Sequence, residues 1–163
     1  MGDLRDGGIA LYRNREWLEG DLQSLAVQRY QLHRIETSAW TSELVMHTSL
    51  AEILEFPDYY GKNLNALDEC IEELKVPEEG GMALVLDSFD RFVGGAGSTI
   101  EDKCHLASQL LDILAGASRF YLLTGRRFIT LVQTDNPRLQ FEGLGCVGAR
   151  WNWREGMHKD RGL

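Results

Sequence analysis

Apolar residues recur along the chain at two spacings, one typical of strands and one typical of helices. Alternation or short unbroken apolar runs predict strands over residues 9–12, 30–35, 82–87 and 128–132, with a weaker edge strand over 149–154. Helical spacing predicts helices over about 16–28, from 42 to just before Pro57, over 64–74, and from Thr99 to about 123. The last ten residues are expected to be frayed.

The helix ends carry sequence signals of their own. Asn63 is placed to cap the third helix, whose buried face is predicted to be Leu64, Leu67, Ile71 and Leu74. Thr99 and Asp102 form a capping-box pattern before the long helix, and Gly125 ends it. Because strands alternate with helices, the chain is predicted to be an α/β protein with a small, mainly parallel sheet flanked by helices. Its 163 residues suit a single domain.

The amino-acid composition limits the classes of protein to which this chain can belong. Hydrophobic residues make up 44% and charged residues 26% of the chain, as in ordinary soluble globular proteins. The three cysteines lack metal-type spacing and are interpreted as reduced, mostly packed thiols: Cys70, Cys104 and Cys146. No apolar run approaches the roughly 20 residues of a membrane span, and the N-terminus lacks the apolar core of a signal peptide. We therefore expect a cytoplasmic protein with no membrane partner.

Negative charge is concentrated in one segment. Residues 52–79 hold nine acidic residues against Lys62 and Lys75, a local charge of −7 in a chain of net charge −8. Such a concentration predicts a surface for a basic partner. The acidic sequence pI of about 5.0 argues against nucleic acid as a direct ligand, because neutralising phosphates needs lysine and arginine.

Three interpretations of these acids are open: a carboxylate-dependent catalytic site, an inert solvated helix face, and a protein interface. Catalysis is the least favoured, because no serine, cysteine or histidine accompanies the acids as nucleophile and base. The segment before the third helix, Phe56-Pro-Asp-Tyr-Tyr-Gly-Lys-Asn63, places Tyr59 and Tyr60 in a turn beside the acids. Aromatic anchors in a charged surface favour the interface.

Other motifs give no cofactor or metal site. Residues 143–148 match G-x-G-x-x-G but lack the helix and the later acidic residue of a dinucleotide site, so a glycine-rich turn is predicted. The glycine-rich loop 94–98 lacks the lysine of a phosphate-binding loop and is interpreted as a connector, with weak anion binding left open. The four histidines show no metal-ligand spacing. We expect neither cofactor nor metal.

The segment 56–70, Phe-Pro-Asp-Tyr-Tyr-Gly-Lys-Asn-Leu-Asn-Ala-Leu-Asp-Glu-Cys, resembles the signature of the barstar and barstar-like ribonuclease inhibitors. The resemblance covers roughly residues 30–133, which leaves a strand–helix extension over 1–29 and a C-terminal extension over 134–163 around a barstar-like core. It implies a non-enzymatic cytoplasmic antidote to a secreted microbial ribonuclease. In that family the acidic helix and the loop before it enter the cationic RNA-binding cleft of the enzyme, where carboxylates occupy phosphate positions.

Residue by residue, the resemblance implies roles for the motif. Tyr59 matches the loop tyrosine that packs on the enzyme's catalytic histidine, and Cys70 matches a buried cysteine. Glu69 falls at the dominant acid of the helix, where the founding member has an aspartate. The chain departs further at Asn65, where that member has a second interfacial aspartate, and at Asp68, where it has a tryptophan.

Further acids complete the predicted interface. Glu72 and Glu73 would supply charge toward a ribonuclease other than barnase. The acid that the family places on its long helix has no clear counterpart in this chain, and Asp112 is included because it is the only acid in the central part of that helix. The predicted partner-binding set is Tyr59, Tyr60, Asn65, Asp68, Glu69, Glu72, Glu73 and Asp112. The predicted partner is a small basic ribonuclease or toxin domain. A basic partner that is not a nuclease, and the carboxylate-dependent hydrolase, are the alternatives.

Overall fold

The structure is a computed structural model that describes residues 8–94, 100–141 and 149–163. Its strands are β1 (Ile9–Tyr12), β2 (Tyr30–Glu36), β3 (Gly81–Asp87), β4 (Phe128–Gln133) and β5 (Arg150–Trp151). Its α-helices are α1 (Arg15–Val27), α2 (Glu43–Ile53), α3 (Leu64–Glu72), α4 (Phe89–Gly94) and α5 (Ile100–Leu123). Short 3₁₀ turns cover Thr37–Ala39, Trp153–Glu155 and His158–Arg161.

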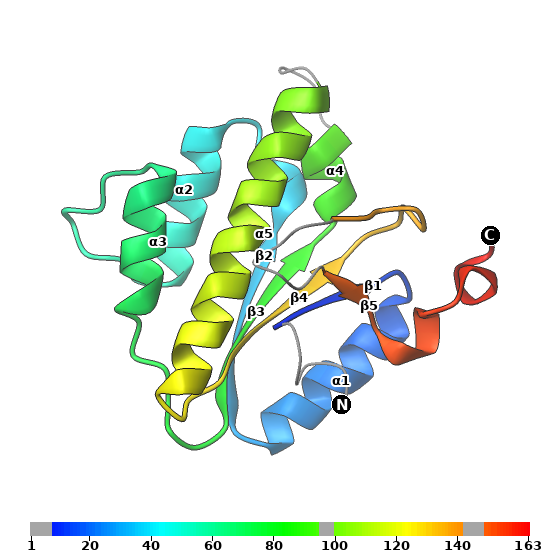
Figure 1. Cartoon of the computed structure of the whole chain (residues 1–163), viewed down its shortest axis with the longest axis horizontal. Coiled ribbons are helices and arrows are strands. Elements are labelled where there is room, and N and C mark those ends of the chain that lie inside the picture. The colour runs from blue at the N-terminus through cyan, green and yellow to red at the C-terminus, as the bar shows by residue number, and fades with distance from the viewer. Residues whose placement is uncertain (1–7, 95–99, 142–148) are drawn as a thin grey trace.

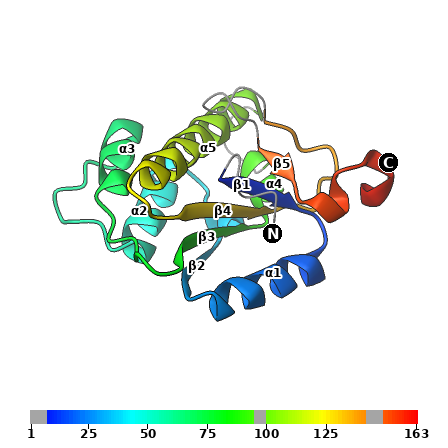
Figure 2. The same ribbon diagram turned by 60° about the horizontal axis from the view of Figure 1, so that its bottom comes forward.

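The five strands form one sheet in the order β2-β3-β4-β1-β5, and each neighbouring pair is parallel. Helix α1 covers one face, while α2, α3, α4 and α5 lie on the other (Figures 1 and 2). The predicted α/β class with a parallel sheet is confirmed. The predicted single domain over 1–163 stays an expectation.

Alternate residues of the central strands pack into two separate hydrophobic cores, one on each face of the sheet. On β3, Met82, Leu84 and Leu86 pack toward α2, α3 and α5, and Ala83 and Val85 pack toward α1. A side-chain period of two on a sheet covered on both faces requires this division. It explains why the central strands read as unbroken apolar runs in the sequence.

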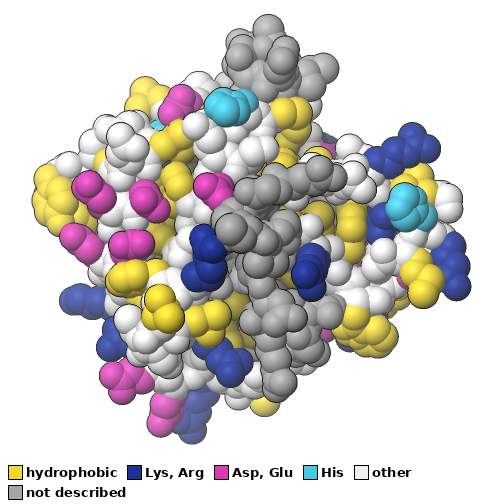
Figure 3. All heavy atoms as spheres, viewed as in Figure 1, with side chains coloured by type: hydrophobic (Ala, Val, Ile, Leu, Met, Phe, Trp, Pro, Cys, Tyr) yellow, Lys and Arg dark blue, Asp and Glu magenta, His cyan; other side chains and the backbone are white. Residues whose placement is uncertain are grey.

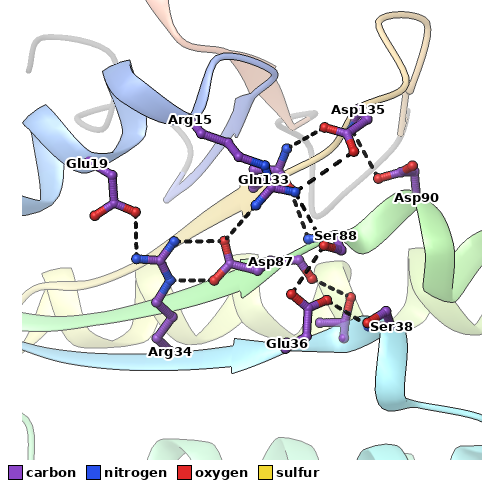
Figure 4. Close-up of polar contacts among 11 residues, drawn as sticks. Arg15, Glu19, Arg34, Glu36, Ser38, Asp87, Ser88, Asp90, Gln133 and Asp135 are labelled. Carbon is purple, nitrogen blue, oxygen red and sulfur yellow. Dashed lines mark hydrogen bonds and ion pairs between the residues drawn. The ribbon is translucent and has the colours of Figure 1, made fainter.

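Helix α1 is tied to the sheet by charge as well as by apolar contacts (Figure 4). Arg34 of β2 forms a bidentate ion pair with the buried Asp87 at the end of β3 and reaches Glu19 of α1 at 2.6 Å. Arg15 of α1 lies 3.9 Å from Asp87 and 3.8 Å from Asp135, beyond the end of β4. The hydrogen bond that Arg34 donates to Asp87 is the main cause of the raised pKa of Arg34. The strand–helix extension is therefore fixed to the rest of the fold at several points.

The C-terminal tail corrects the prediction that the last ten residues are frayed. Glu155 is 1% exposed and accepts hydrogen bonds from the backbone N–H groups of Arg13 at 2.8 Å and Asn14 at 2.9 Å. Arg161 is also buried and donates to the carbonyl of Pro137 at 2.9 Å. Polar contacts order this segment, so the apolar pattern alone could not reveal it.

The buried role of Glu155 gives a testable prediction. Glu155→Ala leaves the partly buried N–H groups of Arg13 and Asn14 without this acceptor, so we expect the free energy of unfolding to fall by about 1–3 kcal/mol. Lys159→Ala, which removes an exposed side chain from the same tail, is the control and should change it by less than about 0.5 kcal/mol. Urea unfolding measures both, and equal, negligible effects would mean that the tail is frayed after all.

Other differences from the sequence predictions are local. Helix boundaries move by one to three residues, as helix ends usually do. Helix α4 has only six residues and escaped prediction, although Phe89, Phe92 and Val93 on it are buried. The capping side chains of Thr99 and Asp102, loop residues 95–99, the turn at 143–148 and Cys146 lie outside the described residues. Among the described helices, none has both the length and the apolarity to cross a bilayer.

Candidate functional site in helix α3 and its preceding loop

Helix α3 buries one face and exposes the other. Of the predicted inner face, Leu67 and Ile71 are fully buried, and Leu64 and Leu74 are partly buried against the core. Cys70 is buried beside them, and the helix packs on α5. Asn63 caps the helix by accepting a hydrogen bond from the backbone N–H of Ala66 at 2.9 Å, which confirms the predicted N-cap. The outer face carries exposed polar residues, namely Asn65, Asp68, Glu69 and Glu72, followed by Glu73. Acidic side chains accordingly gather over α3 in Figure 3.

The two tyrosines of the loop before α3 differ in their exposure to solvent. A turn in which the Tyr60 N–H donates to the carbonyl of Pro57 at 2.9 Å sends the two side chains in different directions. Tyr59 is 75% exposed. Tyr60 is only 7% exposed, with its hydroxyl 2.5 Å from Nδ1 of His47 and its ring against Phe56. Burial raises the pKa of Tyr60 and lowers that of His47. Tyr60 is therefore a core residue that supports the loop in the free protein, and its expected contact with a partner stays a prediction.

Tyr59 links the loop to the acidic helix. Its hydroxyl donates to Oε2 of Glu73 at 3.2 Å, and this hydrogen bond raises the pKa of Tyr59. The bond holds the exposed ring beside the end of α3. The sequence placed both residues in the candidate site but gave no signal for their direct contact.

A tyrosine from α5 fixes the other end of α3. The buried Tyr121 hydroxyl lies within hydrogen-bond distance of the carbonyls of Ile71 at 2.8 Å and Leu74 at 3.0 Å. These carbonyls at the end of α3 also accept from the backbone N–H groups of Leu74 at 3.3 Å and Val76 at 2.9 Å, so the hydroxyl adds a side-chain donor from α5 to the turn that ends the helix. Burial raises the pKa of Tyr121 to about 12. Sequence reasoning placed Tyr121 on the apolar stripe of the long helix and missed its polar role.

The Tyr121 contact predicts a stability change. Tyr121→Phe keeps the ring but removes the hydroxyl that the two carbonyls share, so the free energy of unfolding should fall by about 0.5–1.5 kcal/mol. Tyr59→Phe removes a hydroxyl from an exposed tyrosine and should change it by less than about 0.5 kcal/mol. Chemical denaturation distinguishes the two, and similar midpoints would contradict the anchoring role.

The acidic segment is not uniformly available to a partner. Glu78 pairs with Arg126 at 3.3 Å and Glu79 pairs with Arg29 at 2.7 Å. Within the described part of the chain, Asp68, Glu69 and Glu72 form no such ion pair. Glu52, Glu55 and Asp58 form no ion pair within the described residues either, so the unneutralised charge extends from the end of α2 through the loop to the outer face of α3.

Two grooves flank the C-terminal end of α3. One, of about 960 Å³, lies between α3 and the end of α5 and is lined by Glu72, Phe120, Tyr121 and Arg126 among others. The second, of about 470 Å³, lies between the Tyr59 loop and β2. Within the described residues, no group of three or more histidine, cysteine or acidic side chains could hold a metal ion.

Comparison with known protein families identifies the family to which this chain belongs. Residues 30–133 match the model of the family described as Barstar (barnase inhibitor). The chain belongs to the Barstar family. Over 71 residues it is also 34% identical to a protein of Bacillus subtilis (strain 168) named "Putative ribonuclease inhibitor YrdF"; the match covers 43% of this chain and 74% of that relative. Barstar inhibitors are binding proteins, not enzymes, which agrees with the predicted absence of enzymatic activity.

The Barstar match runs from β2 to β4 and contains every predicted site residue. Strands β1 and β5 lie outside it and extend the sheet beyond β4. Asp112 is exposed on α5, and its part in an interface stays a prediction. In the structure, Tyr59 and Glu73 are in direct contact. The exposed residues Asn65, Asp68, Glu69 and Glu72 all lie on α3, whereas the side chain of Tyr60 is buried in the core.

Proposed function

We propose that this protein inhibits a ribonuclease by inserting α3 and the loop 57–63 into the enzyme's cationic RNA-binding cleft. Family membership supports an inhibitor, since the family is described by its action on barnase and a relative carries the name of a ribonuclease inhibitor. Inhibition requires no catalytic group and no cofactor on this chain. The partner would be a small basic ribonuclease or toxin domain, neutralised inside the cell that produces it.

The observation that carries this proposal is the unpaired charge on a rigid helix. Asp68, Glu69 and Glu72 project into solvent without an intramolecular cation in the described structure. The helix beneath them is fixed by its buried face, by the Asn63 cap and by Tyr121. Preorganised carboxylates lose little entropy when they bind, and an array of one sign speeds encounter with an oppositely charged cleft.

In the complex, the carboxylates of α3 would take the positions of RNA phosphates. Arginine and lysine side chains that bind phosphate bind carboxylate with the same charge and similar geometry. The exposed ring of Tyr59 would pack on the enzyme beside them, as the equivalent tyrosine does in the family. The specificity of the inhibitor for one ribonuclease would then depend on which carboxylates of α3 pair with which cationic side chains of the enzyme.

Two positions indicate that the enzyme differs from barnase. Asn65 lacks the charge that the founding member carries there, and Glu69 is longer by one methylene than the aspartate it replaces. Glu72 lies on the exposed face one turn beyond Glu69 and supplies negative charge in another place. The cognate ribonuclease should accordingly present its strongest cations toward the C-terminal half of α3.

A capture experiment tests the proposal. Immobilised wild-type protein and Glu69→Arg are exposed to a lysate of the source cells at low and at high salt. The proposal predicts that only the wild type retains a small basic protein, that high salt weakens its retention, and that this protein cleaves RNA until the inhibitor is added. Retention of a basic protein that does not cleave RNA would instead favour the alternative, a Barstar-fold module for another partner.

A further inference from the structure

The groove beside Tyr59 is a binding surface that neither the motif nor the acidic face of α3 explains. It has a volume of about 470 Å³ and a floor of apolar and thiol side chains, including Leu54, Phe56, Cys70 and Met82. This volume lies within the range of about 300–1,000 Å³ typical of sites that take small molecules or several side chains. The groove begins at Tyr59, so it continues the proposed interface away from α3.

Charges on the rim of the groove are mostly negative. Glu55 and Glu73 line it, with Lys75 as the one lysine or arginine among its lining residues. Glu73 also accepts the hydrogen bond from Tyr59 at 3.2 Å, so one carboxylate belongs both to the groove and to the proposed interface. An apolar floor under an acidic rim suits an aliphatic segment that carries a cation.

The inner wall of the groove includes one ring nitrogen that has no hydrogen-bond partner within the described structure. Nε2 of His33 is shielded from solvent and makes no hydrogen bond within the described structure. His33 and Gln31 belong to β2, which is the end strand of the sheet and has β3 as its one neighbour among the described strands. Exposed edge strands accept an added strand, whose backbone pairs with theirs while its side chains enter adjacent pockets.

We propose that this groove binds an extended segment of the ribonuclease partner, with an arginine or lysine placed between Glu55 and Glu73 and its apolar neighbours on the floor. The inference rests on the proposed function for the identity of the partner. It adds a second contact region, from Tyr59 to β2, to the one on α3. Through this region the inhibitor would distinguish ribonucleases whose clefts are alike but whose flanking segments differ.

A short peptide tests the chemistry of the groove without the enzyme. The probe is Ac-Leu-Arg-Leu-NH₂, titrated into ¹⁵N-labelled protein and followed by NMR. Saturable shifts are expected at the amides of Gln31, His33, Tyr59 and Cys70, and Ac-Leu-Gln-Leu-NH₂ should produce smaller ones. Shifts confined to the outer face of α3, or no saturable shifts, would overturn the proposed groove.

The captured ribonuclease then tests the groove in the complex. Glu55→Lys reverses a charge on the rim, and Glu52→Lys makes the same change at an exposed position of α2 outside the groove. We expect Glu55→Lys to weaken binding at least about tenfold more than Glu52→Lys, because the control reports only the long-range effect of net charge. Equal effects of these two variants, with binding still lost in Glu69→Arg, would overturn the groove and leave the proposed function standing. Unchanged binding in Glu69→Arg would instead contradict the proposed function.

Discussion

Glu69→Arg is expected to abolish binding of the ribonuclease while leaving the fold intact. Truncating one partner of a buried, paired interfacial charge costs about 2–5 kcal/mol, a range that the barnase–barstar pair itself helped to define. That range corresponds to a loss of affinity of about 30-fold to several thousand-fold, and reversing the charge adds repulsion to it. Calorimetric titration of the captured enzyme with each variant measures the loss.

Two controls isolate the local contribution of Glu69. The side chain is exposed and forms no ion pair in the described structure, so the free energy of unfolding should change by less than about 0.5 kcal/mol. Glu52→Arg carries the same change in net charge on α2, at an exposed position, and should reduce affinity only through weaker long-range attraction. If Glu69→Arg binds as tightly as Glu52→Arg, α3 does not provide the dominant contact.

Leu67→Ala is expected to cause the largest loss of stability among the substitutions in α3. Leu67 is 0% exposed and packs in the main core beneath the acidic face. Removing a buried leucine side chain loses its transfer free energy and leaves a cavity, which together cost about 2–5 kcal/mol. Urea unfolding monitored by circular dichroism should show this change.

The neighbouring residue provides the comparison for Leu67. Asp68→Ala removes an exposed carboxylate from the same turn and should change the free energy of unfolding by less than about 0.5 kcal/mol. The two variants should therefore separate the roles of the helix, with Leu67 needed for folding and Asp68 for binding. A loss below about 1 kcal/mol in Leu67→Ala would show that α3 is not firmly packed on the core.

Periodicity in the sequence predicted most of the fold because most elements bury an apolar face. The spacing of Leu67 and Ile71 identified both the existence of α3 and its inner side, and the unbroken run at 82–87 identified a strand covered on both faces. Helix α4 was missed because six residues are too few to show a helical period. The tail was misjudged because Glu155 and Arg161 hold it by hydrogen bonds to backbone groups distant in the sequence.

The candidate site was predictable only in part. Helical spacing places Asn65, Glu69 and Glu72 on the outer face, and their exposure follows from the burial of the opposite side. Which tyrosine of the pair faces solvent depends on His47, a residue of another helix that accepts Tyr60 into the core. The groove beside Tyr59 also joins β2, α2 and α3, and a contact between three separate elements leaves no periodic signal.

The central claim is that the exposed carboxylates of α3 block the RNA-binding cleft of a ribonuclease, and a titration of RNA cleavage tests it most directly. Increasing amounts of the protein are added to a fixed amount of the captured enzyme, and the initial rate of RNA hydrolysis is measured. The account predicts a linear fall to zero at one equivalent of wild-type protein, and full activity at the same concentration of Glu69→Arg. Equal inhibition by both proteins, or undiminished cleavage with the wild type saturating the enzyme, would contradict it.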